Sequence, residues 1–140
     1  MTVEVRRATI EDVPACARIV DDWLDATPWM PRDTTYAELE AMLTDGMAIR
    51  EIYVAGEPVM GYLAFNPVET KVTGLYCAVR DHGVGKALLD RVKEGRSYVQ
   101  LNTHVPNMRA QRFYMREGFV KCEEVDARDG VRELRMEWRA

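Results

Sequence analysis

Cysteine, long apolar runs and a recognisable export signal are all scarce or missing in this sequence. The cysteines, Cys16, Cys77 and Cys122, are odd in number and far apart, so they suggest neither a disulfide framework nor a CxxC metal motif. The longest apolar runs fall far short of the roughly 20 residues that cross a bilayer. Residues 1–7 lack the basic-then-apolar order of a signal peptide. These absences predict no membrane association and a reducing, cytoplasmic location.

An excess of positive charge is also missing. The chain carries 19 basic and 23 acidic side chains, a formal charge of −4, whereas a general nucleic-acid binder is normally strongly basic. Ser97 is the single serine and does not lie in a GxSxG motif, which disfavours a serine hydrolase. His82 and His104 show no paired metal-ligand spacing. The sequence therefore predicts no nucleic-acid partner and no metal.

What is present has the size and composition of one globular domain. The chain has 140 residues, of which 47% are hydrophobic and 30% charged, and no repeat or linker divides it, so one domain over 1–140 is expected. The predicted order is β-α-α-β-β-β-α-β-α-β-β, a mixed α/β (α+β) fold with helices packed on a central sheet. Capping boxes at Thr9–Asp12 and Thr35–Glu38 begin the first two helices. Strands are expected near 3–8, 47–55, 58–66, 71–79 and 97–103, with a final pair around Asp129 and Gly130. Helices are expected near 10–24, 35–43, 84–95 and 108–116. The apolar faces of the first two helices are expected to bury Ile10, Val13, Ala17, Val20, Leu24, Leu39, Met42 and Leu43.

A glycine loop between the third β run and the following helix is the most informative stretch. It reads Arg80-Asp81-His82-Gly83-Val84-Gly85, and two glycines at a strand-to-helix turn expose backbone N–H groups at the positive end of a helix. The loop is not a Walker motif, because Arg80 stands where the first glycine belongs and Ala87 replaces the hydroxyl. Leu88 replaces the third glycine of a dinucleotide fingerprint. A phosphate site of another kind is predicted.

A second motif follows about twenty residues later. Asn107, Ala110, the Phe113-Tyr114 pair and Gly118-Phe119 stand at the spacing N-x-x-A-x-x-F-Y-x-x-x-G-F. With the R/Q-x-x-G-x-G/A loop before it, the chain resembles the GCN5-related N-acetyltransferase (GNAT) superfamily over nearly its whole length. Here the sequence departs from the family in one respect: the segment between the strand and Arg80 is roughly two residues short.

The resemblance implies a GNAT-like fold and acetyl-coenzyme A as co-substrate. In such a fold the glycine loop holds the pyrophosphate, Asn107 caps a helix and offers its amide to the pantetheine arm, Ala110 leaves room for that arm, and Phe113 anchors the helix. A Gly85→Glu substitution is expected to weaken coenzyme A binding and to leave the fold intact. The implied cofactor-binding residues are Cys77, Ala78, Val79, Arg80, Asp81, His82, Gly83, Val84, Gly85, Lys86, Asn107, Ala110 and Tyr114.

The implied reaction is direct attack of a primary amine on the thioester. Tyr114 is the expected general acid toward the sulfur, and backbone N–H groups near Val79 are the expected oxyanion donors. The general base is left open between Glu69, His104 and a water chain, and Thr73 stands where some relatives carry a glutamate. Cys77 and Cys122 are expected to be small core residues rather than nucleophiles. The rival interpretation is a non-catalytic module that binds or senses acyl-coenzyme A.

Charge is unevenly distributed along the chain. Residues 80–96 hold five basic against three acidic side chains, and residues 107–121 hold four against one, which favours a polyanionic cofactor. Residues 1–48 hold four basic against ten acidic side chains. If residues 1–48 border the acceptor site, as the resemblance implies, their acidic side chains favour binding of a cationic amine of a small molecule or peptide. The same excess of acidic side chains is equally explained by a need for solubility. Trp23, Trp29 and Tyr36 are candidates to line the acceptor pocket; the sequence leaves a homodimer open.

Overall fold

The predicted order of helices and strands is confirmed by the computed structural model, which describes residues 3–80, 82–127 and 129–140. A single 3₁₀ turn, η1 (Ile10–Asp12), precedes the first α-helix. The seven strands form one sheet in the order β1-β2-β3-β4-β5-β7-β6. The elements are β1 (Val5–Arg7), α1 (Val13–Ala26), α2 (Tyr36–Gly46), β2 (Glu51–Ala55), β3 (Gly61–Asn66), β4 (Lys71–Cys77), α3 (Val84–Lys93), β5 (Tyr98–His104), α4 (Met108–Arg116), β6 (Val120–Val125) and β7 (Glu133–Arg139).

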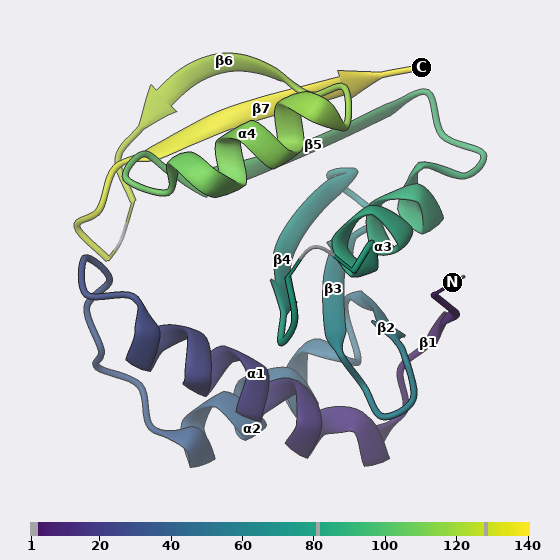
Figure 1. Cartoon of the computed structure of the whole chain (residues 1–140), viewed down its shortest axis with the longest axis vertical. Coiled ribbons are helices and arrows are strands. Elements are labelled where there is room, and N and C mark those ends of the chain that lie inside the picture. The colour runs from purple at the N-terminus through teal and green to yellow at the C-terminus, as the bar shows by residue number, and fades with distance from the viewer. Residues whose placement is uncertain (1–2, 81, 128) are drawn as a thin grey trace.

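The sheet opens between β4 and β5, its single parallel pair among the described strands. These strands pair at Lys71 with Gln100 and at Val72 with Leu101, and then diverge. The register of β3 on β4 shifts at the same level, so that Thr73 forms a bulge opposite Ala64 and Phe65. Figure 1 shows β4 turning away from β5 and leaving the sheet as two halves. The unpaired length of β4 therefore faces a gap rather than a neighbouring strand.

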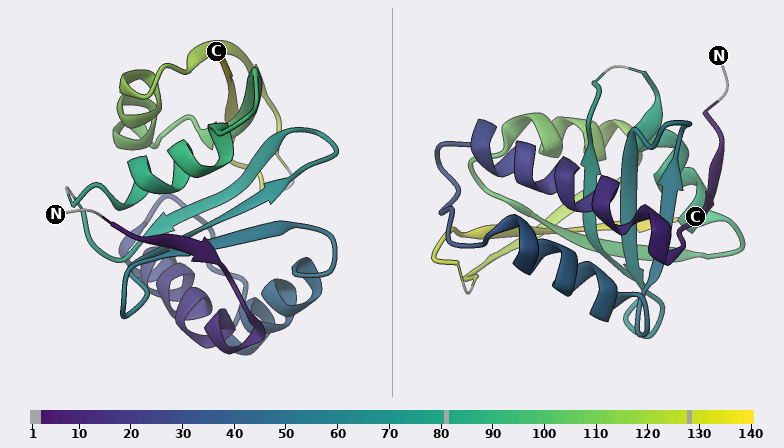
Figure 2. Two further views of the ribbon diagram at one scale, coloured as in Figure 1. Left: turned by 90° about the vertical axis from the view of Figure 1, so that its right-hand side faces the viewer. Right: turned by 90° about the horizontal axis from the view of Figure 1, so that it is seen from below.

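Helices cover both faces of the first half of the sheet. Side chains alternate along β2: Ile52 and Val54 pack in one cluster with α1 and α2, whereas Tyr53 and Ala55 pack in the other with α3. Burial on both faces explains why this strand lacks polar alternation. Figure 2 shows α1 and α2 on one side of the strands and α3 and α4 on the other.

The sequence-based assignment was wrong at several positions. Ile10 is 59% exposed, because it lies in η1 and is out of phase with the buried face of α1. Met42 is 64% exposed on α2, where Leu39 is the buried residue. Residues 47–50 form turns after α2 rather than the start of a strand. Cys122 is exposed on β6, an edge strand, and is not a core residue.

Asp12 joins β1 to the start of the first helical segment. Its carboxylate accepts two hydrogen bonds from the Arg6 guanidinium, both at 2.8 Å, and one from the Thr9 N–H at 2.8 Å. The hydrogen bonds from Arg6 are the main reason that the pKa of Asp12 lies below its usual value; burial opposes them, and Thr9 adds to them. The folded state is therefore stabilised by the ionised form of Asp12.

Replacing Asp12 with asparagine tests this pair through its pH dependence. Because the folded-state pKa is depressed, the stabilisation is complete above the unfolded-state pKa of about 3.9 and is lost as pH falls through the lower folded value. We expect Asp12→Asn to lower the free energy of unfolding by about 1 kcal/mol at pH 7, since Arg6 is partly exposed. Urea unfolding should show this difference shrinking below about pH 4. A difference that stays constant to pH 3 would contradict the role of the charge.

Candidate active site

A cavity of about 140 Å³ occupies the gap where β4 and β5 diverge. Strands supply two of its walls, helix α4 a third, and α1 and β7 one residue each. Among the sequence-predicted residues, this cavity brings together Asn107, Ala110 and Tyr114. Its other lining residues are Trp23, Val72, Thr73, Gly74, Leu75, Tyr76, Leu101, Asn102, Thr103, His104 and Glu133.

The edge of β4 presents backbone hydrogen-bonding groups to this gap. The Ala78 N–H donates to the Met60 carbonyl at 2.7 Å, which makes Ala78 and Met60 a hydrogen-bonded pair of the β3–β4 ladder. Because pairing alternates along antiparallel strands, the N–H and C=O groups of Cys77 and Leu75 point away from β3, toward the side where β5 has separated. An extended ligand lying in the gap can pair with them. The Ala78 N–H is already used within the sheet, so a contact of Ala78 with a cofactor must use its other atoms.

Tyr114 lies one helical turn after Ala110 on α4, and both line the cavity. The side chain is 8% exposed and also packs against Phe113 and Phe119. Its hydroxyl makes no hydrogen bond with any described residue, so the phenol is available to a ligand. Burial raises the pKa of Tyr114 well above the ordinary value, and Tyr76 and Cys77 add to the shift. The phenol is therefore protonated at physiological pH and can act as a donor.

Asn107 begins α4 as predicted. Its side-chain oxygen accepts a hydrogen bond from the Ala110 N–H at 3.1 Å, and this use of the oxygen leaves the amide NH₂ to be offered elsewhere. The next residue, Met108, is the first of the helix, in agreement with the predicted range of 108–116.

Substitution of Asn107 tests its role as the N-cap of α4. We expect Asn107→Ala to lower the free energy of unfolding by about 1 kcal/mol, the usual value of an N-cap, because the Ala110 N–H loses its acceptor. Asn107→Asp keeps an acceptor at the cap and places a negative charge near the positive end of the helix, so it should be as stable as the wild type. Denaturant unfolding of the three proteins measures the difference. Equal stabilities of the alanine and aspartate variants would rule out the cap.

The glycine loop leads from β4 into α3. Gly83 is the N-cap of α3 with φ of +75°, a left-handed conformation that favours glycine, and no side chain caps the first turn. The N–H groups of that turn are thus open to an anion. Arg80 and His82 are exposed, with the His82 ring against the Arg80 carbonyl, and Val84 is buried. Asp81 lies outside the described residues.

Gly85 has a packing role that the sequence did not reveal. A Cβ atom at Gly85 would lie 3.0 Å from Cζ of Phe113, so the start of α3 approaches α4 closely only because residue 85 is glycine. A glutamate at Gly85 therefore requires the Phe113 ring to move, a consequence that the expectation of a largely intact fold did not include. Lys86 Nζ lies 3.1 Å from Asp90 of the same helix and 3.4 Å from Glu117, the residue that follows α4. The described residues of the loop do not line the cavity, but the contacts of Gly85 and Lys86 hold the start of α3 next to α4.

Of the other predicted residues, two do not line the cavity and a third has a thiol that stays protonated. The Tyr36 hydroxyl donates to the Pro14 carbonyl, so Tyr36 supports the α1–α2 contact and does not line the cavity. Glu69 is exposed in the turn before β4 and is not a lining residue. Burial raises the pKa of the Cys77 thiol to about 11, which disfavours a thiolate.

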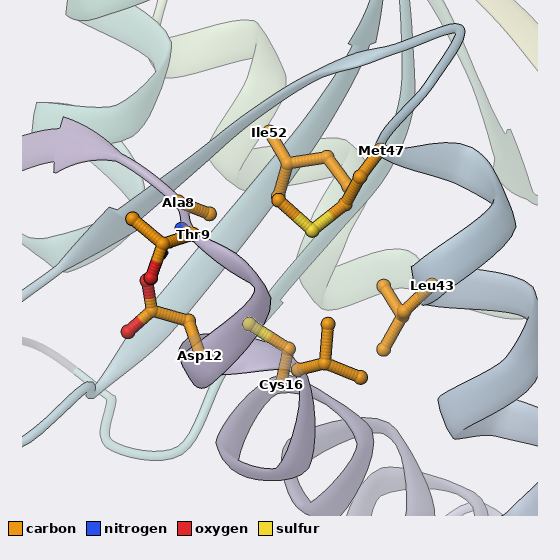
Figure 3. A pocket seen from close by; sticks show the side chains of 8 residues that line it. Ala8, Thr9, Asp12, Cys16, Leu43, Met47 and Ile52 are labelled. Carbon is orange, nitrogen blue, oxygen red and sulfur yellow. Dashed lines mark hydrogen bonds between the residues drawn. The ribbon is translucent and has the colours of Figure 1, made fainter.

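A second, much smaller cavity of about 10 Å³ lies between α1, α2 and β2. Figure 3 shows the Cys16 and Met47 side chains approaching it from opposite sides. This volume is at the lower limit for one water molecule, far too small for a coenzyme. Burial raises the pKa of Cys16 to about 12, so this thiol is a packing residue.

Asp129 and Glu133 are site residues that sequence reasoning missed. The sequence indicated Asp129 only as the point, with Gly130, around which the last two strands pair, and it did not single out Glu133. In the structure His104 Nε2 lies 2.9 Å from Asp129 Oδ2 and 3.6 Å from Glu133 Oε2. Asn102 donates to Glu133 Oε1 at 3.0 Å, while its own side-chain oxygen is buried without a partner among the described residues. No sequence signal joined these residues, because they are brought together by the β5–β7 pairing.

Two groups of residues within the described chain place three potential metal-ligand atoms within 4.8 Å of one another. In His104, Asp129 and Glu133 the imidazole Nε2 is occupied by a direct hydrogen bond with Asp129. In Asp21, Asp22 and Asp25 the Arg32 guanidinium pairs with two of the three carboxylates. Neither arrangement identifies a metal site. No helix of the described chain combines the length and apolar character needed to cross a membrane.

Comparison with known proteins gives one family and one fold. A family model described as an acetyltransferase (GNAT) domain matches residues 27–140. Apo-YjaB from Escherichia coli has a similar structure, with a TM-score of 0.79 at 21% identity over 99% of this chain and 98% of that one. YncA from Salmonella typhimurium, solved with its cofactor acetyl-coenzyme A, has a TM-score of 0.74 at 18% identity over 99% and 94%. A ribosomal-protein-alanine N-acetyltransferase from Brucella melitensis gives 0.76 at 19% over 98% and 99%. No curated protein sequence matches the chain.

Proposed function

The chain belongs to the GNAT acetyltransferase family, and from that premise we propose that it transfers the acetyl group of acetyl-coenzyme A to a primary amine of a small molecule or peptide. The observation that carries the proposal is the cavity between β4 and β5. It is lined by the part of β4 that does not pair with β5 and by Tyr114, whose hydroxyl has no hydrogen-bond partner among the described residues. The acetyl-coenzyme A in the YncA structure supports the choice of co-substrate.

The cofactor is proposed to lie across three features of the fold. Its pyrophosphate would bind at the uncapped start of α3, near Gly83. Its pantetheine arm would pair with the backbone of Leu75 and Cys77 and pass the small side chain of Ala110. This places the thioester in the cavity beside Tyr114. Arg80, His82, Val84 and Lys86, with Val79 and Asp81, stay predictions for the phosphate end.

The proposed reaction is direct attack of the amine nitrogen on the thioester carbon. Backbone N–H groups near Val79, just after β4, would stabilise the oxyanion. The Ala78 N–H is not one of them, because it donates to the Met60 carbonyl. When the C–S bond breaks, the thiolate takes a proton from the Tyr114 hydroxyl. The reaction needs no protein nucleophile, in agreement with the raised pKa of Cys77.

A thiol-release assay tests the proposed function. Purified protein is incubated with acetyl-coenzyme A and, in separate reactions, polyamines, aminoglycosides, amino acids and short peptides; free thiol is followed and the product is identified by mass. We expect thiol release that depends on an amine, together with an amine product heavier by one acetyl group. Tight binding of acetyl-coenzyme A with no release from any amine would support the non-catalytic binding module instead. The cytoplasmic location and a homodimer stay predictions.

A further inference from the structure

Resting on the proposed function, we propose that His104, oriented by Asp129, is the general base that removes a proton from the acceptor amine. His104 is the last residue of β5 and lines the same cavity as Tyr114. Sequence reasoning left the base open between Glu69, His104 and water. The structure places His104 at the cavity and Glu69 away from it.

Two neighbours, Asp129 and Trp29, fix the position of the His104 ring. Asp129 Oδ2 lies 2.9 Å from Nε2, and the other oxygen of Asp129 accepts a hydrogen bond from the Val131 N–H at 2.9 Å. The carboxylate is therefore held by the backbone of its own loop. The indole of Trp29 contacts the imidazole, with ring centroids 5.3 Å apart. A base oriented by a carboxylate is an arrangement that recurs in acid–base catalysis.

This contact also decides which nitrogen can act as base. An ionised carboxylate only accepts hydrogen bonds, so Nε2 carries the proton and donates it to Asp129. In a neutral imidazole the other nitrogen, Nδ1, then has a free lone pair. Nδ1 makes no hydrogen bond with any of the residues that the structure describes. Since His104 lines the cavity, Nδ1 is the nitrogen that we propose accepts the proton of a ligand there.

The charged groups around His104 favour a cationic amine. Asp129 faces it from the β6–β7 loop and Glu133 from β7. Tyr76 of β4 also lines the cavity; burial, then Glu133 and Asp129, raise its pKa, so it stays neutral. Burial acts to raise the pKa of Asp129, but hydrogen bonds from His104 and the Val131 N–H outweigh it, and the pKa lies below its usual value. Two carboxylates thus attract an ammonium group and stabilise the imidazolium that deprotonation creates.

The protons balance as follows. An ammonium acceptor gives one proton to His104 Nδ1, which passes it to solvent, and the neutral amine then forms the C–N bond. As the C–S bond of the zwitterionic adduct breaks, Tyr114 gives its hydroxyl proton to the departing thiolate. The adduct then loses its second nitrogen proton, which reprotonates the Tyr114 phenolate. The products are the acetylated amine, coenzyme A as free thiol, and one proton in solution.

Kinetics against pH test the base. With acetyl-coenzyme A and the amine of highest thiol release in the panel, we expect wild-type kcat/KM to show an acidic limb, as a histidine base produces. His104→Gln should lower kcat/KM about 10²-fold or more at neutral pH and abolish that limb. Acetyl-coenzyme A affinity should not change. A folded His104→Gln protein that keeps both its activity and the acidic limb overturns the proposal.

Asp129→Asn gives a second measurement that does not require removal of the imidazole. Because the acceptor that orients the imidazole is weakened, kcat should fall about tenfold, while the affinity for acetyl-coenzyme A should not change. Asp126→Asn is the matched control in the same loop, since Asp126 is 88% exposed and pairs with Arg132. Full kcat in a folded Asp129→Asn protein contradicts the orienting role. Loss of wild-type activity in EDTA that Zn²⁺ restores would also overturn the proposal, in favour of a metal.

Nuclear magnetic resonance separates this inference from the proposed function, because it needs no acceptor. The chain has two histidines, His82 and His104, so a ¹⁵N-histidine spectrum is simple, and His104→Gln assigns it. We expect the Nε2–H tautomer at His104, with a mixture of tautomers in Asp129→Asn. An Nδ1–H tautomer in the wild type overturns the base assignment even if the protein is an active acetyltransferase. The expected tautomer in a protein that acetylates no amine means that the proposed function has failed and that the geometry stands.

Discussion

Tyr114→Phe is expected to lower the turnover number about 10²-fold while leaving the affinity for coenzyme A nearly unchanged, because it removes the proton donor and keeps the ring. The ring of residue 114 packs against Phe113 and Phe119, and a phenylalanine can make the same contacts. The hydroxyl makes no hydrogen bond with a described residue, so its removal leaves no described donor or acceptor unpaired. The loss should therefore appear in kcat and not in stability.

The raised pKa of Tyr114 sets the pH dependence of this effect. Since burial keeps the phenol protonated well above its ordinary range, wild-type activity should not fall as pH rises from 7 to 9 through ionisation of Tyr114. A thiolate released into the same buried cavity is also poorly solvated, which strengthens its tendency to take a proton. The ratio of wild-type to Tyr114→Phe turnover should thus be constant over this range.

Steady-state kinetics with the best acceptor measure the ratio, and calorimetry with coenzyme A measures the affinity. Tyr62→Phe is a control, because Tyr62 is a buried tyrosine that stacks on Tyr76 and does not line the cavity. We expect its turnover to match the wild type. Full turnover in Tyr114→Phe would remove Tyr114 from the mechanism, and equal losses in both variants would attribute the effect to packing.

The order of the elements could be predicted because it depends on local patterns. The range 108–116 for α4 was predicted correctly, since Asn107 caps the helix and Ala110 and Tyr114 lie on one face. Ile10 was misplaced because a 3₁₀ turn, which has a different period, comes before α1.

The sequence predicted one part of the candidate site and missed another. Tyr114, Ala110 and Asn107 belong to one continuous motif, and all three line the cavity. His104 and Asp129 are 25 positions apart and meet through the pairing of β5 with β7, so no local spacing could join them. Contacts of this kind depend on the register in which distant strands pair, which a local sequence pattern does not contain.

Gly85 also makes a long-range contact that the sequence could not predict. Its place in a glycine loop suggested only a contact with phosphate, because the sequence does not indicate that Phe113 lies against it. A substitution at Gly85 would therefore disturb the α3–α4 contact and the phosphate site together, and loss of binding could not be attributed to either. Gly83 avoids a clash of this kind, since no described residue, apart from its chain neighbours, lies within 4 Å of a Cβ built there.

Gly83→Asp is accordingly expected to weaken coenzyme A binding at least tenfold relative to Gly83→Asn, which is about 1.4 kcal/mol. Asparagine and aspartate share the strain that φ of +75° imposes on a residue other than glycine, and both can cap a helix, so these effects cancel in the comparison. They differ in charge, and the aspartate places its carboxylate where the pyrophosphate is proposed to bind at the start of α3. Calorimetry with coenzyme A at two salt concentrations should show the gap between the variants narrowing as salt screens the repulsion. Equal affinities in two folded variants would mean that the phosphates bind elsewhere.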